Sequence, residues 1–233
     1  MNQGKKKTTL SSKAGFWILI LCGISVVSYI GVRTLEVQED RSKIAELENQ
    51  INDMRSALDA DSVRQFNIQK IITIIDQYNV EMPVHKKYEI AEEIFRMANK
   101  YSNLNVDLIC ATITYESAGT WDPEVVSPAG AMGLMQIMPT TGMFVATFEN
   151  LAWSSPEEIL FDPIYNIRIG SRYLSTLIDL YDIDGGLAAY NGGERRAALW
   201  LGNGKANGIL ARETQEYVPA VTKLYAEFQQ FQL

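Results

Sequence analysis

The chain has 233 residues, enough for one sizeable hydrophobic core, and its hydrophobic content of 47% is ordinary for a protein that folds. The net charge of −7 is unevenly distributed, since residues 1–33 sum to +5 and residues 34–233 to −12. So acidic a surface would repel phosphate backbones, which excludes nucleic acid as an expected partner.

The first predicted element is a membrane span. Residues 1–15 carry lysines and no acid, and the stretch Phe16–Val32 that follows is uncharged. As a helix, this stretch would span about 26 Å, near the lower limit for crossing a bilayer. We therefore expect a cytoplasmic basic tail at residues 1–15 and a single transmembrane anchor at residues 16–33.

The charges around the span predict its orientation. Lysines precede it and Glu36, Glu39 and Asp40 follow it, so the positive-inside rule places the N-terminus in the cytoplasm and residues after Arg33 outside the cytoplasmic (inner) membrane. One alternative is a cleaved signal peptide with serines at its cleavage site. Another is lipidation of Cys22, but this residue follows a leucine rather than the usual small residue. An uncleaved anchor is favoured.

Residues 34–80 are predicted to form a helical, coiled-coil-like stalk. The segment 37–77 is rich in charged residues and contains no Pro or Gly. Its apolar residues follow a 3-4 heptad spacing, at Ile44, Leu47, Ile51, Met54, Leu58, Ile68, Ile72 and Ile75. A helix of this length would reach roughly 60 Å. The pattern favours a homo-oligomer formed through the stalk, and the alternative is a single amphipathic helix that folds back on the domain.

The remaining residues, 81–233, are predicted to form a mainly helical domain, separated from the stalk by Pro83. No strand-like alternation of any length occurs, which predicts an all-α fold. One helix is expected over Lys86–Tyr101 because apolar residues share one face. Another is expected over Val106–Ser117, with Asn105 as its N-cap. Asp162-Pro163 opens a third, with Ile167, Gly170, Tyr173, Leu174 and Leu177 facing inward.

Several kinds of site are disfavoured by residue type. His85 is the single histidine and has no cysteine near it, so neither a metal site nor another cofactor is expected. A serine triad would have to use His85, and no Gly-x-Ser-x-Gly precedes it. Asp182–Gly185 lacks the spaced ligands and closing Glu of a calcium loop. Cys22 and Cys110 are far apart in sequence, so no internal disulfide is expected.

Glu116 is the candidate for acid chemistry. It shares a helical face with Ile109, Thr112 and Ile113, so it ends an otherwise apolar stripe. Partial burial would raise its pKa, as a general acid at neutral pH requires. The alternative is a solvent-facing glutamate at a helix end.

Two later segments offer groove residues. The stretch 121–139 is rich in Gly, Ser, Pro and Met, and its Gln136 could donate and accept hydrogen bonds to a sugar. Met135 is expected in the core rather than in a groove. Residues 185–193 predict a short helix ended by glycines, from which Tyr190 and Asn191 could project into a cleft.

These segments carry a resemblance. Glu116-Ser117, GLMQIMPTT at 133–141, AAYNGG at 188–193 and ETQEYV at 213–218 resemble, in order and spacing, motifs of the soluble-lytic-transglycosylase family, which is related to goose-type lysozymes. The similarity covers about residues 86–228. It implies a lysozyme-like helical catalytic domain with peptidoglycan glycan strands as substrate, and the predicted anchor places this domain outside the cytoplasmic membrane.

The resemblance also implies a mechanism with one carboxyl group. Glu116 would protonate the oxygen between N-acetylmuramic acid and N-acetylglucosamine, then accept the proton of the muramoyl C6 hydroxyl as a base. This hydroxyl closes on C1 and leaves a 1,6-anhydro end. Matched to the family's motifs, the substrate-binding residues would be Ser127, Gln136, Met138, Tyr190, Asn191, Glu213 and Tyr217, with Tyr217 orienting the acid. Gly119-Thr120 lengthens the family's usual spacing before Trp121.

Two other functions fit the same fold. A hydrolytic muramidase would need a second carboxylate that activates water, and Asp122 is the nearest in sequence. A non-catalytic, wall-binding scaffold would use the stalk and keep a relict site, which the intact motifs disfavour.

Overall fold

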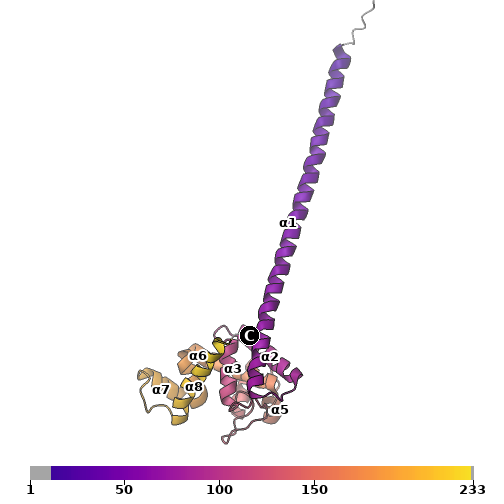
Figure 1. Ribbon diagram of the computed structural model, residues 1–233. Coiled ribbons are helices and arrows are strands. Elements are labelled where there is room, and N and C mark those ends of the chain that lie inside the picture. The colour runs from indigo at the N-terminus through magenta and orange to yellow at the C-terminus, as the bar shows by residue number, and fades with distance from the viewer. Residues whose placement is uncertain (1–11, 232–233) are drawn as a thin grey trace, which may run out of the picture. The chain divides into compact units, whose positions relative to one another are not determined.

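The computed structural model describes residues 12–231, and its regular elements are helical throughout this range (Figure 1). They are α1 (Ser12–Tyr78), α2 (Val84–Lys100), α3 (Val106–Glu116), α4 (Pro139–Ala146), the 3-10 helix η1 (Thr147–Glu149), α5 (Pro156–Leu160), α6 (Pro163–Gly192), α7 (Glu194–Gly202) and α8 (Arg212–Gln229). Two isolated β-bridges lie in the loop before α4. The predicted all-α class is confirmed. The predicted basic tail lies mostly outside the described residues.

The chain divides into two units, one ending at Asp61 and one beginning at Ser62. In the first unit, Gly15–Leu35 is long and apolar enough to cross a membrane by length and composition, and it overlaps the predicted anchor. The heptad residues Ile44, Leu47, Ile51, Met54 and Leu58 are exposed in this unit. Membrane insertion and self-association of the stalk therefore stay predictions.

The last turns of α1 belong to the second unit. Ile68, Ile71 and Ile75 are buried in its core. The ammonium of Lys70 pairs with the Asp107 carboxylate of α3 at 2.7 Å. The compact unit thus begins at Ser62, about 20 residues before the start at residue 81 that the sequence suggested. The heptad stripe continues across this boundary, and the part of it after Ser62 packs within the second unit.

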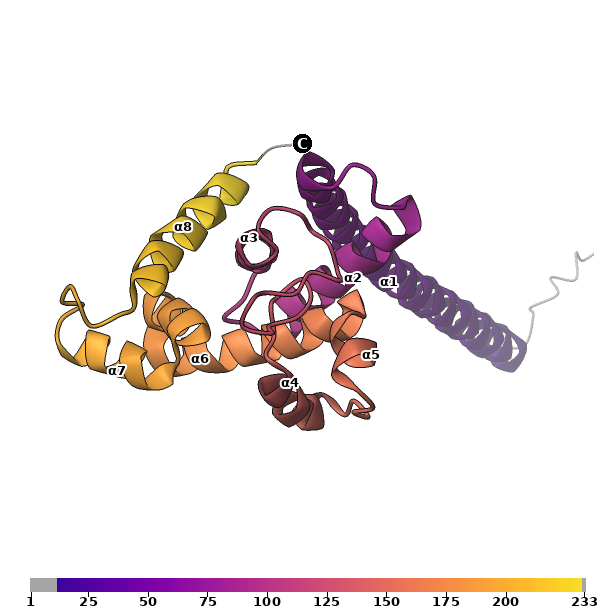
Figure 2. The ribbon, with the colours of Figure 1, turned by 90° about the horizontal axis from the view of Figure 1, so that it is seen from below.

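Helix α6 is the centre of the second unit and contacts α2, α4, α5, α7 and α8. Figure 2 shows it running from α5 to the end where α7 and α8 lie. It begins as predicted, since the Asp162 carboxylate accepts hydrogen bonds from the backbone N–H groups of Ile164 and Tyr165. A non-helical residue, Asp182 (φ 58°), bends it and makes the last turns the short helix predicted around residues 185–193.

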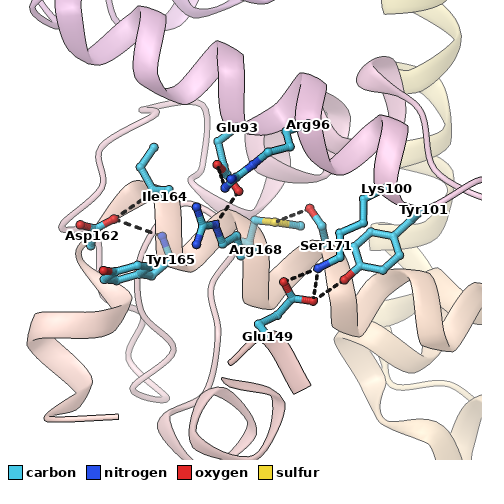
Figure 3. A network of polar contacts seen from close by, with 11 residues as sticks. Glu93, Arg96, Lys100, Tyr101, Glu149, Asp162, Ile164, Tyr165, Arg168 and Ser171 are labelled. Carbon is cyan, nitrogen blue, oxygen red and sulfur yellow. Dashed lines mark hydrogen bonds and ion pairs between the residues drawn. The ribbon is translucent and has the colours of Figure 1, made fainter. Parts of the chain in front are cut away.

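Helices α2 and α3 complete the core behind α6. The Asn105 side chain caps α3 as predicted, accepting from the backbone N–H of Leu108 at 2.9 Å. On α2, the buried carboxylate of Glu93 pairs with Arg96 and with Arg168 of α6 (Figure 3). Helix α3 packs against both α2 and α8. Helix α3, which ends at Glu116, is therefore held by a helix on each of two sides.

Candidate active site

Glu116 is the last residue of α3, and it follows a run of buried residues that includes Ile109, Thr112 and Ile113. Burial raises its pKa from the ordinary value of 4.5 to about 8. The Tyr217 hydroxyl opposes this rise, and the negative charge of Glu213 adds to it. Glu116 therefore holds a proton at neutral pH, which suits a general acid.

Tyr217 lies on α8 and is fully buried, with its ring edge-to-face against Tyr115 at 4.9 Å between centroids. Its hydroxyl has no partner in ordinary hydrogen-bond geometry among residues 12–231, yet it lies close enough to Glu116 to lower the pKa of that carboxyl. A buried hydroxyl in this state is a donor that can form a hydrogen bond to the Glu116 carboxylate when Glu116 becomes charged.

Tyr190 lies near the end of α6. Its hydroxyl donates to the backbone carbonyl of Met135 at 2.8 Å. Burial, and next the negative charge of Glu116, raise the pKa of Tyr190 well above its ordinary value, so the hydroxyl stays protonated. The bond joins the end of α6 to the groove loop, beside the carboxyl of Glu116.

The neighbouring Asn191 carries a second unused polar atom. Its side-chain oxygen is buried and has no hydrogen-bond partner among the described residues. A buried acceptor without a partner costs free energy unless a ligand or water completes it. Asn191 therefore offers an acceptor for an N–H or O–H group of a bound molecule.

The groove loop differs from its expected form at Gln136. The side-chain NH₂ group donates to the backbone carbonyls of Val125 and Gly133, at 3.2 and 2.9 Å, and the residue has a left-handed φ of 47°. Its donor is used to hold the loop, which leaves the amide oxygen for a ligand. Met138 is 42% exposed and can supply apolar wall, whereas Met135 is fully buried, as expected.

Asn166 of α6 holds this loop in place through hydrogen bonds to the backbone. Its side chain is fully buried, accepts from the backbone N–H of Met135 at 2.8 Å, and donates to the carbonyls of Met132 and Leu160 at 2.9 Å each. A Cβ at Gly133 would lie 2.2 Å from the Asn166 amide, so only glycine fits there. No supporting role for Asn166 was assigned from the sequence. The available signal was a polar residue on the predicted apolar face of α6.

The remaining predicted residues are placed differently. Glu213 is exposed in the first turn of α8 and acts on Glu116 through its charge. Ser127 closes a tight turn, where its hydroxyl accepts from the backbone N–H of Ala131 at 3.0 Å. No described contact joins Ser127 to Glu116. The structure thus places Tyr190, Tyr217 and Glu213 close enough to Glu116 for each of them to interact with it electrostatically.

The inserted Gly119-Thr120 forms a turn after α3. Ala118, Gly119 and Trp121 all have positive φ. The indole N–H of the fully buried Trp121 donates to the Thr114 hydroxyl at 3.0 Å. Trp121 therefore holds this turn against α3, the helix that ends at Glu116.

Comparisons with known proteins agree with this geometry. The family model described as "Transglycosylase SLT domain" matches residues 93–211. The soluble lytic murein transglycosylase of Escherichia coli K12 is 35% identical over 150 residues, which cover 60% of this chain and 23% of the relative. The transglycosylase of Enterobacteria phage PRD1 is 35% identical over 106 residues, covering 45% of this chain and 36% of the relative. The chain therefore spans about a quarter of the length of the first of these relatives.

Solved structures give the same result. The crystal structure of the 70 kDa soluble lytic transglycosylase of Escherichia coli has a TM-score of 0.53 and 31% identity, over 62% of this chain and 26% of that one. The lytic transglycosylase Slt of Pseudomonas aeruginosa has a TM-score of 0.54 and 26% identity, over 67% and 25% of the two chains. The lysozyme-like, all-α fold is confirmed.

Proposed function

Because the chain belongs to the transglycosylase SLT domain family, we propose that it is a peptidoglycan lytic transglycosylase that uses Glu116 as its catalytic acid and base. The bond cleaved is the β-1,4 bond between N-acetylmuramic acid and N-acetylglucosamine, and the product carries a 1,6-anhydro end. The observation that carries the proposal is the partly buried carboxyl of Glu116, whose pKa is raised to about 8.

The proposed reaction needs no water. Protonated Glu116 donates to the glycosidic oxygen, and the bond from this oxygen to C1 of the muramoyl sugar breaks. The resulting carboxylate then takes the proton of the C6 hydroxyl, whose oxygen bonds to C1 and restores the acid. The Tyr217 hydroxyl stabilises the carboxylate between the two steps, because its presence lowers the pKa of Glu116.

The surrounding residues would hold the substrate. The unpartnered oxygen of Asn191 suits the N–H of an N-acetyl group. Met138 would pack on sugar faces, and the free oxygen of Gln136 would accept from a hydroxyl. Ser127, Tyr190 and Glu213 complete the proposed site, by resemblance to the family's motifs and by their positions around the groove loop and Glu116.

Product analysis distinguishes this reaction from hydrolysis. Full-length chain in detergent, incubated with purified peptidoglycan, is expected to release muropeptides with 1,6-anhydro ends, one water lighter than hydrolysis products by mass spectrometry. Glu213 is a second carboxylate whose charge reaches Glu116, so a hydrolase that uses it to activate water is the competing function. Products with reducing ends would support that hydrolase and contradict the proposal.

We propose further that the first unit anchors the enzyme in the cytoplasmic membrane, with the second unit outside, and that the stalk self-associates. Alkaline extraction should then leave the chain in the membrane pellet.

Ile51→Asp would place a charge in the exposed heptad stripe and is expected to reduce the oligomer to a monomer in analytical ultracentrifugation. Asn49→Asp is the control, since Asn49 lies on the opposite helix face. A monomeric wild type would contradict self-association.

A further inference from the structure

The turn that follows Glu116 has a strained backbone. The backbone N–H of Ala118 donates to the carbonyl of Tyr115 at 3.0 Å. That of Gly119 donates to the carbonyl of Thr114 at 2.8 Å, which completes the Schellman pattern of bonds at the end of α3. This pattern puts Ala118 in the left-handed conformation, with a φ of 50°, where glycine is usual. The conformation is unfavourable for a residue with a side chain.

Trp121 carries the same strain at the other end of the turn. Its φ is 48°, although its side chain is bulky. This side chain is fully buried, and the backbone N–H of Trp121 donates to the Ser117 hydroxyl at 3.2 Å. Such strained positions persist only where surrounding contacts determine them, and they gather at functional sites. The turn therefore needs support from other parts of the fold.

The end of α1 supplies contacts of this kind. A Cβ added at Gly119 would lie 3.6 Å from Cδ1 of Tyr78, so the Tyr78 ring lies against the turn. The side-chain NH₂ group of Asn79 donates to the backbone carbonyl of Trp121 in a long bond of 3.5 Å. Tyr78 is half-buried and packs against the hydrophobic core. Residues at the end of α1 thus contact the strained turn at two places.

The last turns of α1 are themselves held by the helices of the candidate active site. The buried ammonium of Lys70 pairs with the Asp107 carboxylate in the first turn of α3 at 2.7 Å. Burial, and next the negative charge of Glu227 on α8, raise the pKa of Tyr78, so its phenol lies near that helix. The end of α1 is therefore fixed relative to α3 and α8, and it can support the turn.

We propose that Tyr78 and Asn79 are positioning residues of the active site, which hold the strained turn after α3 and so keep the Glu116 carboxyl in place. The inference rests on the proposed function of Glu116. Both residues lie before the range 93–211 that matches the family model, and the turn contains the inserted Gly119-Thr120. The longer turn reaches α1, and α1 in return holds its strained backbone.

The test begins with Tyr78→Ala in full-length protein in detergent. A loosened turn misplaces the acid, so kcat on peptidoglycan is expected to fall about threefold to tenfold, with KM unchanged. Tyr78→Phe keeps the ring and should keep wild-type kcat. Ile72→Ala is the control for lost packing, since it removes a buried side chain about 9 Å earlier on the same helix. It should lower the melting temperature but not kcat, when all variants are assayed at a temperature where they are folded.

Ala118→Gly separates positioning from packing. Glycine adopts a φ of 50° without strain, so the turn should no longer depend on α1. In the Ala118→Gly background, Tyr78→Ala should therefore lower kcat less than about twofold, which a double-mutant cycle measures. A loss of kcat as large as in the wild-type background would overturn the inference, because the Tyr78 ring would then act through packing alone.

The titration of Glu116 gives a readout that needs no activity. Carbon-13 NMR of the carboxyl follows its pKa, which burial raises to about 8 in the wild type. The titratable groups that interact with this carboxyl are Tyr115 of α3, Tyr190 of α6, and Glu213 and Tyr217 of α8. All of them are retained in the variants, so a lower pKa reports that the carboxyl has moved toward water.

Tyr78→Ala is expected to lower the pKa of the Glu116 carboxyl toward its ordinary value of 4.5, and Ile72→Ala to leave it unchanged. Asn79→Ala should act in the same direction as Tyr78→Ala but less strongly, and it decides the question if Tyr78→Ala does not fold. An unchanged pKa in both variants would overturn the positioning role. A lowered pKa in a chain whose wild type cleaves no peptidoglycan would support the positioning role and contradict only the proposed function.

Discussion

Replacing Glu116 with glutamine is expected to lower kcat on peptidoglycan by roughly 10²–10⁴-fold. Glutamine has the same shape but neither donates an acidic proton nor accepts one back, so both proposed steps lose their catalyst. Release of soluble muropeptides, followed by chromatography, measures the loss. Glu216→Gln removes an exposed carboxylate of α8 that pairs with Arg212 on the surface, and it should keep full activity. A Glu116→Gln protein with wild-type turnover would contradict the mechanism.

Because the pKa of Glu116 is raised, the activity and the stability of the wild type should depend on pH in a way that Glu116→Gln abolishes. The proposed acid must be protonated, so wild-type kcat/KM should fall as the pH rises above about 8. The free energy of unfolding also depends on whether Glu116 is protonated. The folded state binds this proton more tightly than the unfolded state, so Glu116 lowers the stability of the fold as pH rises from about 4.5 to about 8.

The stability loss has a slope of at most about 1.4 kcal/mol per pH unit in that window. Glutamine has no such proton to lose. Glu116→Gln should therefore be as stable as the wild type at pH 4 and more stable at pH 8, when denaturant unfolding is compared at the two values. A variant that combines lost activity with gained alkaline stability has lost a functional group rather than its fold.

The sequence was most informative where a single helix determines the outcome. Asn105 caps α3 and Asp162 caps α6 through bonds to their own next turns, so nothing distant was needed to predict them. The partial burial of Glu116 follows in the same way, from its place on an apolar face of α3. Such features depend on spacing along the chain, which the sequence displays directly.

The stalk shows why periodicity alone is insufficient. Ile51 and Ile72 occupy equivalent places in one heptad pattern, yet Ile51 is exposed and Ile72 is buried in the domain. An apolar stripe on a helix favours burial against another apolar surface. The stripe does not specify whether that surface belongs to a second copy of the chain or to the same chain. The periodicity therefore does not distinguish the stalk from the first turns of the compact unit, which begins at Ser62.

The groove loop depended on contacts between distant residues. Gln136 was expected to offer both of its polar groups to a sugar, but its NH₂ group holds the loop from within. The loop is irregular, so its backbone groups need partners that no helix supplies. Those partners come from α6, more than 30 residues away in sequence, and no local pattern announces them.

Asn166 supplies most of these partners, and its removal is expected to have the largest effect on stability. Asn166→Ala would leave the N–H of Met135 and the carbonyls of Met132 and Leu160 buried without partners. At about 1–3 kcal/mol for each unsatisfied group, partly relieved by loop movement, we expect a loss of roughly 3–5 kcal/mol. The melting temperature should fall by about 6–20 °C, as measured by circular dichroism.

The same change should also impair the proposed chemistry, because Met135 carries the carbonyl that accepts from Tyr190 beside Glu116. At a temperature where Asn166→Ala is still folded, its kcat should be reduced while the alkaline pKa of the rate profile is retained. Asn99→Ala is the control, since among residues 12–231 that exposed amide bonds only to the Phe95 carbonyl of its own helix, and it should melt like the wild type. If Asn166→Ala also melted like the wild type, the loop would have to be held by its own backbone turns. Tyr190 and Glu116 would then owe their placement to the helices alone.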